Sequence, residues 1–257
     1  MKFLKKIIII ALKQLDLGSA VAVRLTKLTG KSKVPIHPKH FLEKRPWFVK
    51  YIKKGDIVLD LGSGNGQNAI KSAKFAKKII GLEFNESLLK IARDSVKAKR
   101  LKNVEFKKAN LEDKIKLNDA SVNKVIFLDV LEHLSNRQQA LQEIKRVLKS
   151  RGLLLVSVPN SQTSWKKLQR SVGVCSFSDP DHKVEFTQKQ IESLLEKFGF
   201  KTIYLGYSSF DTPLRGLIDI LGGFSLTTYK FLTNLRIEAA QKNPQEASGF
   251  EIIAQSV

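Results

Sequence analysis

From about residue 47 onward, short apolar runs alternate with longer stretches that have helical periodicity. In the helical stretches apolar residues recur every three to four positions, as in Leu88, Leu89 and Ala92 after a capping Asn85. The short runs predict strands, namely Ile57–Leu61, Lys78–Glu83, Val104–Lys108, Lys124–Asp129, Leu153–Val158, Lys201–Tyr207 and Gly249–Gln255. Strand–helix alternation is typical of a mostly parallel sheet with helices on both faces. We therefore predict an α/β, Rossmann-like doubly wound domain over residues 47–257.

Two segments interrupt this alternation. Residues 159–183 lie between the fifth strand and the next helix, and residues 209–248 lie between the last two strands. Connections of that length are unusual unless they carry function or structure of their own. The second segment contains a largely apolar stretch, 214–232. We interpret both segments as insertions in the domain.

Residues 1–46 predict an amphipathic helical extension. The uninterrupted apolar run Ile7–Leu12 is far too short to span a bilayer. Lys5 and Lys6 before this run also fit a signal peptide, but Lys13 and Asp16 break its apolar stretch. We expect the extension either to pack on the main domain or to lie on an anionic membrane surface.

The charge balance narrows the classes of partner. Lys and Arg number 45 against 24 Asp and Glu, a formal net charge of +21. Such a charge attracts nucleic acid, anionic lipid or phosphorylated substrates. The lysines are spread along the whole chain, so a solvated basic surface explains them equally well. Cys175 is the single cysteine, which excludes an intrachain disulfide and fits a reducing compartment.

The most specific pattern is IVLDLGSGNGQNAI, residues 57–70, which runs from a strand through a glycine-rich turn into a helix. Gly62, Gly64 and Gly66 let the backbone approach a ligand without Cβ clashes. A dinucleotide fold would instead space its glycines as GxGxxG around a pyrophosphate. Asp60 stands beside this turn, where a carboxylate favours a cationic ligand. S-adenosylmethionine (SAM), with its ammonium and sulfonium groups, satisfies that requirement.

The ends of the following strands carry further candidate cofactor contacts. Glu83 follows the second strand and can accept hydrogen bonds from both ribose hydroxyls of an adenosine group. Phe84 can line the adenine pocket, and the side-chain amide of Asn110 can bond to the adenine amino group. The predicted cofactor-binding set comprises Asp60, Gly62, Ser63, Gly64, Gly66, Glu83, Phe84, Asn110, Leu111 and Asp129.

Together the segments LDLGSGNG, GLEFN, ANLED, FLDVLEHL and LKSRGLLLVSVPN resemble the class I SAM-dependent methyltransferase superfamily. The resemblance covers residues 47–205, with a fainter match at SGFEIIAQ near the C-terminus. DVLEHL is similar to the small-molecule and ubiquinone-pathway O-methyltransferase-like group. The resemblance implies a seven-stranded sheet with strand 7 antiparallel between strands 5 and 6. It also implies SAM as cofactor and methyl transfer as the activity.

A second constellation comprises Asp129, Glu132, His133 and the distant His182. In ubiquinone-pathway O-methyltransferases and small-RNA 2′-O-methyltransferases, an E-x-x-E-H motif with a later histidine can hold a divalent cation. Here the first carboxylate is the shorter Asp129. We favour the alternative without a metal, in which Glu132 and His133 support the strand-to-helix turn. In a third interpretation His133 or His182 acts as general base on an acceptor hydroxyl. Glu132, His133 and His182 are therefore the candidate catalytic residues.

The acceptor is the least determined feature. We expect a small-molecule or lipid-linked acceptor methylated on oxygen, with the two insertions over the acceptor site. An RNA methyltransferase is the main alternative, because of the net charge of +21. No RNP-type stretch is visible, and DVLE replaces the [D/N/S]-P-P-[Y/F/W] motif of adenine N6 and cytosine N4 methylation. A non-catalytic SAM-binding module is the third alternative. We expect a cytoplasmic protein with peripheral contact at the inner face of the membrane.

Overall fold

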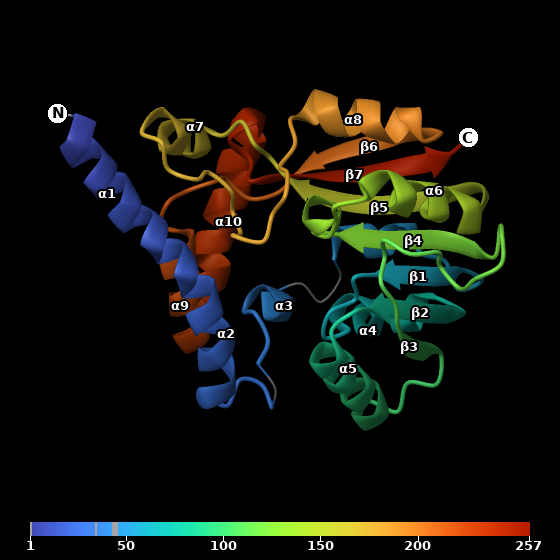
Figure 1. The fold of residues 1–257 in the computed structure, drawn as a ribbon. Helices are drawn as coiled ribbons and strands as arrows, with labels where there is room; N and C mark the ends of the chain where they lie inside the picture. Colours follow the sequence, from blue (N-terminus) through green and yellow to red (C-terminus); the bar gives the residue numbers. More distant parts are fainter. Residues whose placement is uncertain (1, 34, 43–45) are drawn as a thin grey trace. The chain divides into compact units, whose positions relative to one another are not determined.

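The computed structural model describes residues 2–33, 35–42 and 46–257 (Figure 1). Residues 1, 34 and 43–45 of the predicted N-terminal extension lie outside the described residues. The described chain groups into two compact units. The first, here called the helical unit, comprises Met1–Lys44, Pro159–Thr187 and Tyr207–Phe250. The second, the sheet unit, comprises Arg45–Val158, Gln188–Gly206 and Glu251–Val257.

The sheet unit is built on a seven-stranded sheet of order β3-β2-β1-β4-β5-β7-β6. Its strands are β1 Ile57–Leu61, β2 Lys78–Glu83, β3 Val104–Lys108, β4 Val122–Leu128, β5 Leu148–Pro159, β6 Phe200–Tyr207 and β7 Gly249–Ser256. The strand β7 runs opposite to its neighbours, as its arrow shows (Figure 1). The predicted doubly wound sheet with an antiparallel strand 7 is therefore confirmed.

Parallel register aligns the carboxyl ends of the central strands. β1 pairs with β2 from Ile57↔Lys78 to Leu61↔Leu82, and with β4 through Asp60↔Ile126. β5 begins five residues earlier than the apolar run Leu153–Val158 predicts, because Leu148 pairs with Val122 across a register shift. In a doubly wound sheet this edge, at the carboxyl ends of the strands, is where ligands bind.

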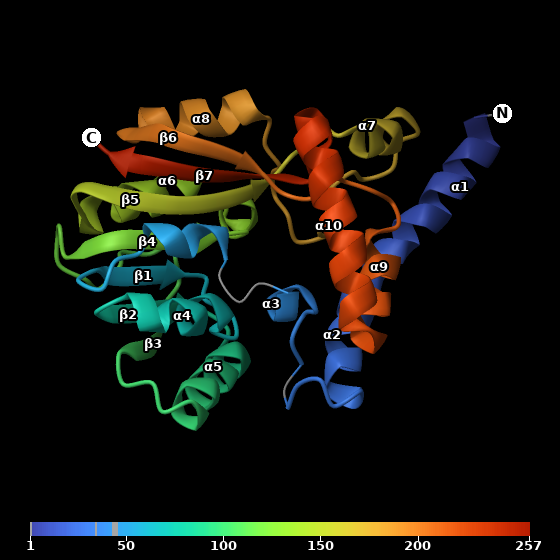
Figure 2. The same cartoon turned by 180° about the vertical axis from the view of Figure 1, so that it is seen from behind.

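Helices cover both faces of this sheet. They are α4 Gln67–Ser72, α5 Glu86–Ala98, α6 Arg137–Val147 and α8 Gln188–Lys197, with short 3₁₀ turns at Trp47–Tyr51, Ala73–Phe75 and Leu131–His133. The helix α6 lies on the face seen in Figure 1 and α4 on the face seen in Figure 2. Asn85 caps α5 as predicted, since its Oδ1 accepts hydrogen bonds from the N–H groups of Ser87 and Leu88. Val58, Ile79 and Ile126 lie at the centre of the buried core.

The helical unit gathers three segments that are far apart in the sequence. Its helices are α1 Lys2–Gln14, α2 Gly18–Leu28, α3 Lys39–Leu42, α7 Ser164–Ser171, α9 Arg215–Phe224 and α10 Leu226–Lys242, with short 3₁₀ turns at Leu15–Leu17 and Pro244–Glu246. The N-terminal extension is helical, as predicted. The segments interpreted as insertions, 159–183 and 209–248, both fall in this unit. No helix in the described ranges combines the length and the apolarity needed to cross a membrane.

Glycine lets α2 and α9 approach closely. A Cβ atom on Gly18 would lie 2.3 Å from the carbonyl oxygen of Gly216. Thr29 Oγ1 donates a hydrogen bond to the carbonyl oxygen of Gly223, 2.9 Å away. The buried carboxylate of Asp219 accepts hydrogen bonds from Ser19 and from the hydroxyl of Tyr229. Backbone contact and the bonds of Thr29 and Ser19 thus join α2 to α9, and the Tyr229 bond joins α9 to α10.

Candidate cofactor site

The three glycines of the turn after β1 all have left-handed backbone conformations. The φ angles of Gly62, Gly64 and Gly66 are 65°, 53° and 79°, values that side chains disfavour. A Cβ atom on Gly62 would lie 2.5 Å from Val130 Cγ2, and one on Gly66 would lie 2.6 Å from Phe106 Cζ. Around Gly64, no atom of the described chain lies within 4 Å of such a Cβ. Packing therefore requires the outer two glycines, whereas Gly64 borders open space.

Asp60, on β1 just before this turn, is a buried acid. Its side chain is 1% exposed, and its Oδ2 has no hydrogen-bond partner within the described parts of the chain. Burial raises the pKa of Asp60 to about 7, with the charge of Glu83 adding to that effect and a hydrogen bond from the Ala69 N–H opposing it. Ser63 Oγ, in the turn, is also buried without a described partner. Both oxygens can accept a hydrogen bond from a bound cationic group.

Glu83 connects the end of β2 to the glycine turn. Its Oε2 accepts a hydrogen bond from the N–H of Gly64 at 2.9 Å, and its Oε1 accepts one from the N–H of Asn85 at 2.8 Å. A carboxylate offers about four acceptor positions. Glu83 therefore retains capacity for two hydroxyl donors while it holds the turn. The neighbouring side chain of Phe84 is 68% exposed.

The remaining predicted cofactor residues follow β3 and β4. Asn110 Oδ1 accepts a hydrogen bond from the N–H of Glu112 at 3.1 Å, and Leu111 is buried. Asp129 lies beyond the end of β4 with φ 56°, and Ser157 Oγ donates to its Oδ1 at 2.7 Å. This left-handed conformation ends β4 one residue before the predicted end of the strand. The predicted set thus lies along the carboxyl edge of β1, β2, β3 and β4.

Glu132 and His133 occupy the 3₁₀ turn after β4, Leu131–His133. The side chain of Glu132 is buried, and that of His133 is half-buried. The N–H of His133 donates to the carbonyl oxygen of Val130 at 3.0 Å, which closes the turn. Both residues belong to the sheet unit, the unit that carries the glycine turn.

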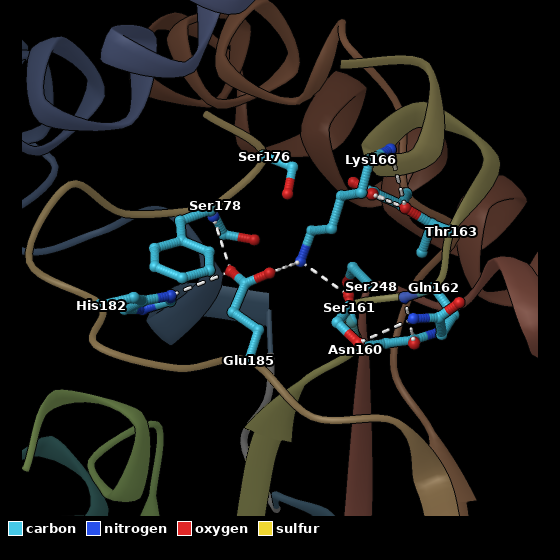
Figure 3. Close-up of polar contacts among 12 residues, drawn as sticks. Asn160, Ser161, Gln162, Thr163, Lys166, Ser176, Ser178, His182, Glu185 and Ser248 are labelled. Atoms are coloured by element: carbon cyan, nitrogen blue, oxygen red, sulfur yellow. Dashed lines mark hydrogen bonds and ion pairs between the residues drawn. The ribbon is translucent and has the colours of Figure 1, made fainter. Parts of the chain in front are cut away.

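His182 belongs to the helical unit and takes part in a buried polar cluster (Figure 3). His182 Nδ1 lies 2.9 Å from Glu185 Oε1, which also accepts a hydrogen bond from the N–H of Ser178 at 2.6 Å. Lys166 Nζ donates to Glu185 Oε2 at 2.6 Å and to the carbonyl oxygen of Asn160 at 2.7 Å. Glu185 therefore orients both a histidine and a lysine.

Lys166 and Glu185 are the polar residues that the sequence analysis missed. The Lys166 side chain is 2% exposed and that of Glu185 is 0% exposed. Burial raises the pKa of Glu185, but the hydrogen bond with His182 and the charge of Lys166 outweigh burial and hold that pKa at about 2. Burial lowers the pKa of Lys166, and the charge of Glu185 opposes that effect. Their spacing in the sequence has no period that would have identified the pair.

The fold and the glycine turn define a SAM-methyltransferase-like protein. Residues 52–199 match the family described as methyltransferase domain, which is more than half of the chain. The chain belongs to this family, and its resemblance to the class I SAM-dependent methyltransferases is confirmed.

Two curated relatives are described as probable S-adenosylmethionine-dependent methyltransferases. A probable S-adenosylmethionine-dependent methyltransferase of Mycolicibacterium smegmatis is 32% identical over 183 residues, covering 68% of this chain and 65% of that protein. The match to a Mycobacterium tuberculosis relative of the same description, 34% identical, covers 56% of this chain and 48% of that protein. The chain therefore spans between about half and two thirds of these relatives.

Two further matches cover a larger share of the matched protein. A demethylmenaquinone methyltransferase of Lactobacillus johnsonii is 26% identical, covering 80% of this chain and 74% of that protein. The solved structure of a SAM-dependent methyltransferase from Methanosarcina mazei has a TM-score of 0.58 at 20% identity, covering 82% of this chain and 97% of the other. At that identity, the structural likeness establishes the fold alone.

Proposed function

We propose that this chain transfers a methyl group from SAM to a small-molecule or lipid-linked acceptor, on an oxygen atom. The observation that carries the proposal is Asp60. A buried carboxylate whose Oδ2 has no hydrogen-bond partner in the described ranges stands beside a turn with open space at Gly64. An unpaired buried charge is costly, so such a group is typical of a site that a ligand completes.

The residues present fit SAM. Asp60 and Ser63 would face its cationic part, and Glu83 would accept its ribose hydroxyls with the lone pairs left by Gly64 and Asn85. Asn110 and Leu111 would border the adenine ring of SAM, and Phe84 would cover the exposed side of that ring. SAM supplies a methyl group already activated on a sulfonium. The protein's contribution is then alignment of the acceptor, exclusion of water and removal of a proton.

His133 is the candidate proton acceptor in the unit that holds the glycine turn. Its imidazole is half-buried, and imidazole is the side chain that most often serves as a general base. The buried Glu132 beside it, on the same 3₁₀ turn, would support its position. His182, oriented by Glu185 in the helical unit, is the second candidate base. We retain the interpretation that neither histidine requires a metal.

A small or lipid-linked acceptor is supported by the relative named demethylmenaquinone methyltransferase, which is matched along 80% of this chain. RNA is the alternative acceptor, supported by the net charge of +21. A SAM-binding module without methyl transfer is the other alternative. Incubation with labelled SAM and separate RNA, metabolite and lipid extracts distinguishes the three, because the label appears in one fraction or in none.

Calorimetry tests the cofactor directly. We expect SAM and S-adenosylhomocysteine to bind with micromolar dissociation constants and NAD to give no signal. Gly64→Ala should abolish this binding, because its Cβ would occupy the open space beside the turn. Gly173→Ala is the matched control, since Gly173 also has a left-handed φ, 70°, and open space around its Cβ. Binding of NAD without SAM would refute the proposal.

A further inference from the structure

An exposed apolar stripe runs along one side of the N-terminal helices of the helical unit. Its members are three, four or seven positions apart, so those within each helix share one face of that helix, and the 3₁₀ turn Leu15–Leu17 separates the two helices. They are Phe3, Ile7, Ile10, Leu17, Val21 and Leu28, with exposures between 41% and 80%. Leu4 and Ile8 flank the stripe and are also exposed. A soluble helix normally buries its apolar face, and this one leaves it open to solvent.

A second stripe of the same kind runs along α9. Leu214, Leu217, Leu221 and Phe224 recur every three or four positions and are 39–60% exposed. The two helices run side by side in the same direction, because Gly18 meets Gly216 and, further along both helices, Thr29 bonds to Gly223. Successive residues of an α-helix are rotated by about 100° around its axis. Viewed along the common direction of α2 and α9, the stripe of α2 is rotated away from the contact residues in one direction, and the stripe of α9 is rotated away from them in the opposite direction. In a parallel pair that arrangement places both stripes on the same side.

The α2–α9 contact explains why these large side chains remain exposed. Gly18 and Gly216 bring the two backbones together, and Leu25 of α2 packs against Gly223 of α9. The buried Asp219 of α9 accepts a hydrogen bond from Ser19 of α2. The exposed leucine and phenylalanine side chains of the two stripes are therefore not the ones that form the closest contacts between these helices. The exposed stripes of α2 and α9 lie on one side of this helix pair, and the exposed apolar residues of α1 precede them along the chain; together they are here called the docking face.

Basic residues border the docking face. Residues 1–42 contain nine Lys or Arg and a single acid, Asp16. That acid is paired, at 3.8 Å from Lys13 and 3.6 Å from Arg215. Lys5, Lys6, Arg24 and Lys27 are exposed on the same helices. The edge of the docking face is thus positive.

We propose that the docking face binds the surface of an anionic lipid bilayer. An amphipathic helical face with leucine, isoleucine and phenylalanine beside lysine and arginine is suited to the headgroup region of such a bilayer. Each basic residue near an anionic surface adds to the attraction, and salt weakens that attraction. Two copies of the chain would bring like charges together at this face, which disfavours self-association. The inference goes beyond methyl transfer and does not depend on it.

Vesicle flotation of the full chain tests the proposal without cofactor or acceptor. We expect the protein to float with vesicles that contain phosphatidylglycerol at low salt, to float less at high salt, and not to float with pure phosphatidylcholine. Lys5→Glu with Lys6→Glu should lower the vesicle partition coefficient at least about tenfold. Leu217→Ser with Leu221→Ser should lower it as strongly, because both side chains lie exposed on α9.

Matched controls lie in the sheet unit. Lys99→Glu with Lys102→Glu makes the same charge change at exposed positions, and Ile203→Ser removes an exposed apolar side chain of β6. Both controls should float like the unmodified protein, and circular dichroism should report every variant as folded. Flotation at neither salt concentration, or equal flotation of docking-face and control variants, would overturn the proposal. Sedimentation that shows a dimer abolished by the Leu217 and Leu221 changes would assign the face to a second copy instead.

Discussion

The strongest single test of the site is Asp60→Asn. Asparagine has nearly the shape of the native side chain, and its Oδ1 can still accept the hydrogen bond from Ala69. The substitution removes the charge that burial disfavours, so it mimics the protonated acid. We expect a protein that is more stable without ligand at alkaline pH and weaker in binding SAM.

The magnitude follows from the pKa of Asp60, which rises from 3.8 to about 7. A carboxyl with a raised folded-state pKa binds its proton more tightly in the folded chain, so its ionisation destabilises the fold as pH rises from 3.8 to 7. Each unit of that difference is worth about 1.4 kcal/mol. Between pH 5 and pH 8 the unmodified protein should therefore lose about 2–3 kcal/mol of stability that the Asn variant retains.

Urea unfolding of both proteins at pH 5 and pH 8 measures this difference, because all other titrating groups are common to the pair. Calorimetry at pH 8 should then show SAM affinity reduced roughly tenfold or more, the scale of a lost charge-assisted hydrogen bond. Asp94→Asn makes the same chemical change at an exposed position of α5 and should alter neither quantity. A stability difference that does not change with pH would refute the reasoning about Asp60.

Three further outcomes are expected. Glu83→Ala should weaken SAM binding by roughly 1–3 kcal/mol in calorimetry, and unchanged affinity would assign the ribose contact to another residue. EDTA should reduce methyl transfer only slightly, whereas complete loss restored by Mg²⁺ or Mn²⁺ would contradict the interpretation without a metal. Lys166→Met should lower the free energy of unfolding by about 3–5 kcal/mol, because it leaves Glu185 buried and ionised, and the exposed Lys167→Met should have little effect. The cost should shrink as pH falls from 4.5 toward 2, where Glu185 takes up its proton.

The sequence determined the elements of the sheet unit because their signals are local. Short apolar runs predicted all seven strands; β1, β2 and β3 match at both ends, and the other boundaries lie within two residues of the prediction except at the start of β5. Leu148 joins the sheet through pairing with Val122, a partner that periodicity cannot supply. The glycine pattern and Asp60 identified the candidate cofactor turn. Both the left-handed φ angles of these glycines and the position of Asp60 at the end of β1 depend on residues that are close together in the sequence.

Tertiary structure decided everything that depends on distant partners. Periodicity did not predict that the N-terminal helices, residues 159–187 and residues 207–250 form one unit, because that grouping depends on contacts between segments far apart in the chain. Similarly, Lys166 and Glu185 are ordinary surface residue types until folding buries them together. The same holds within the turn itself. The sequence presents three equivalent glycines, and only the positions of Val130 and Phe106 separate the two that packing requires from Gly64, which borders open space.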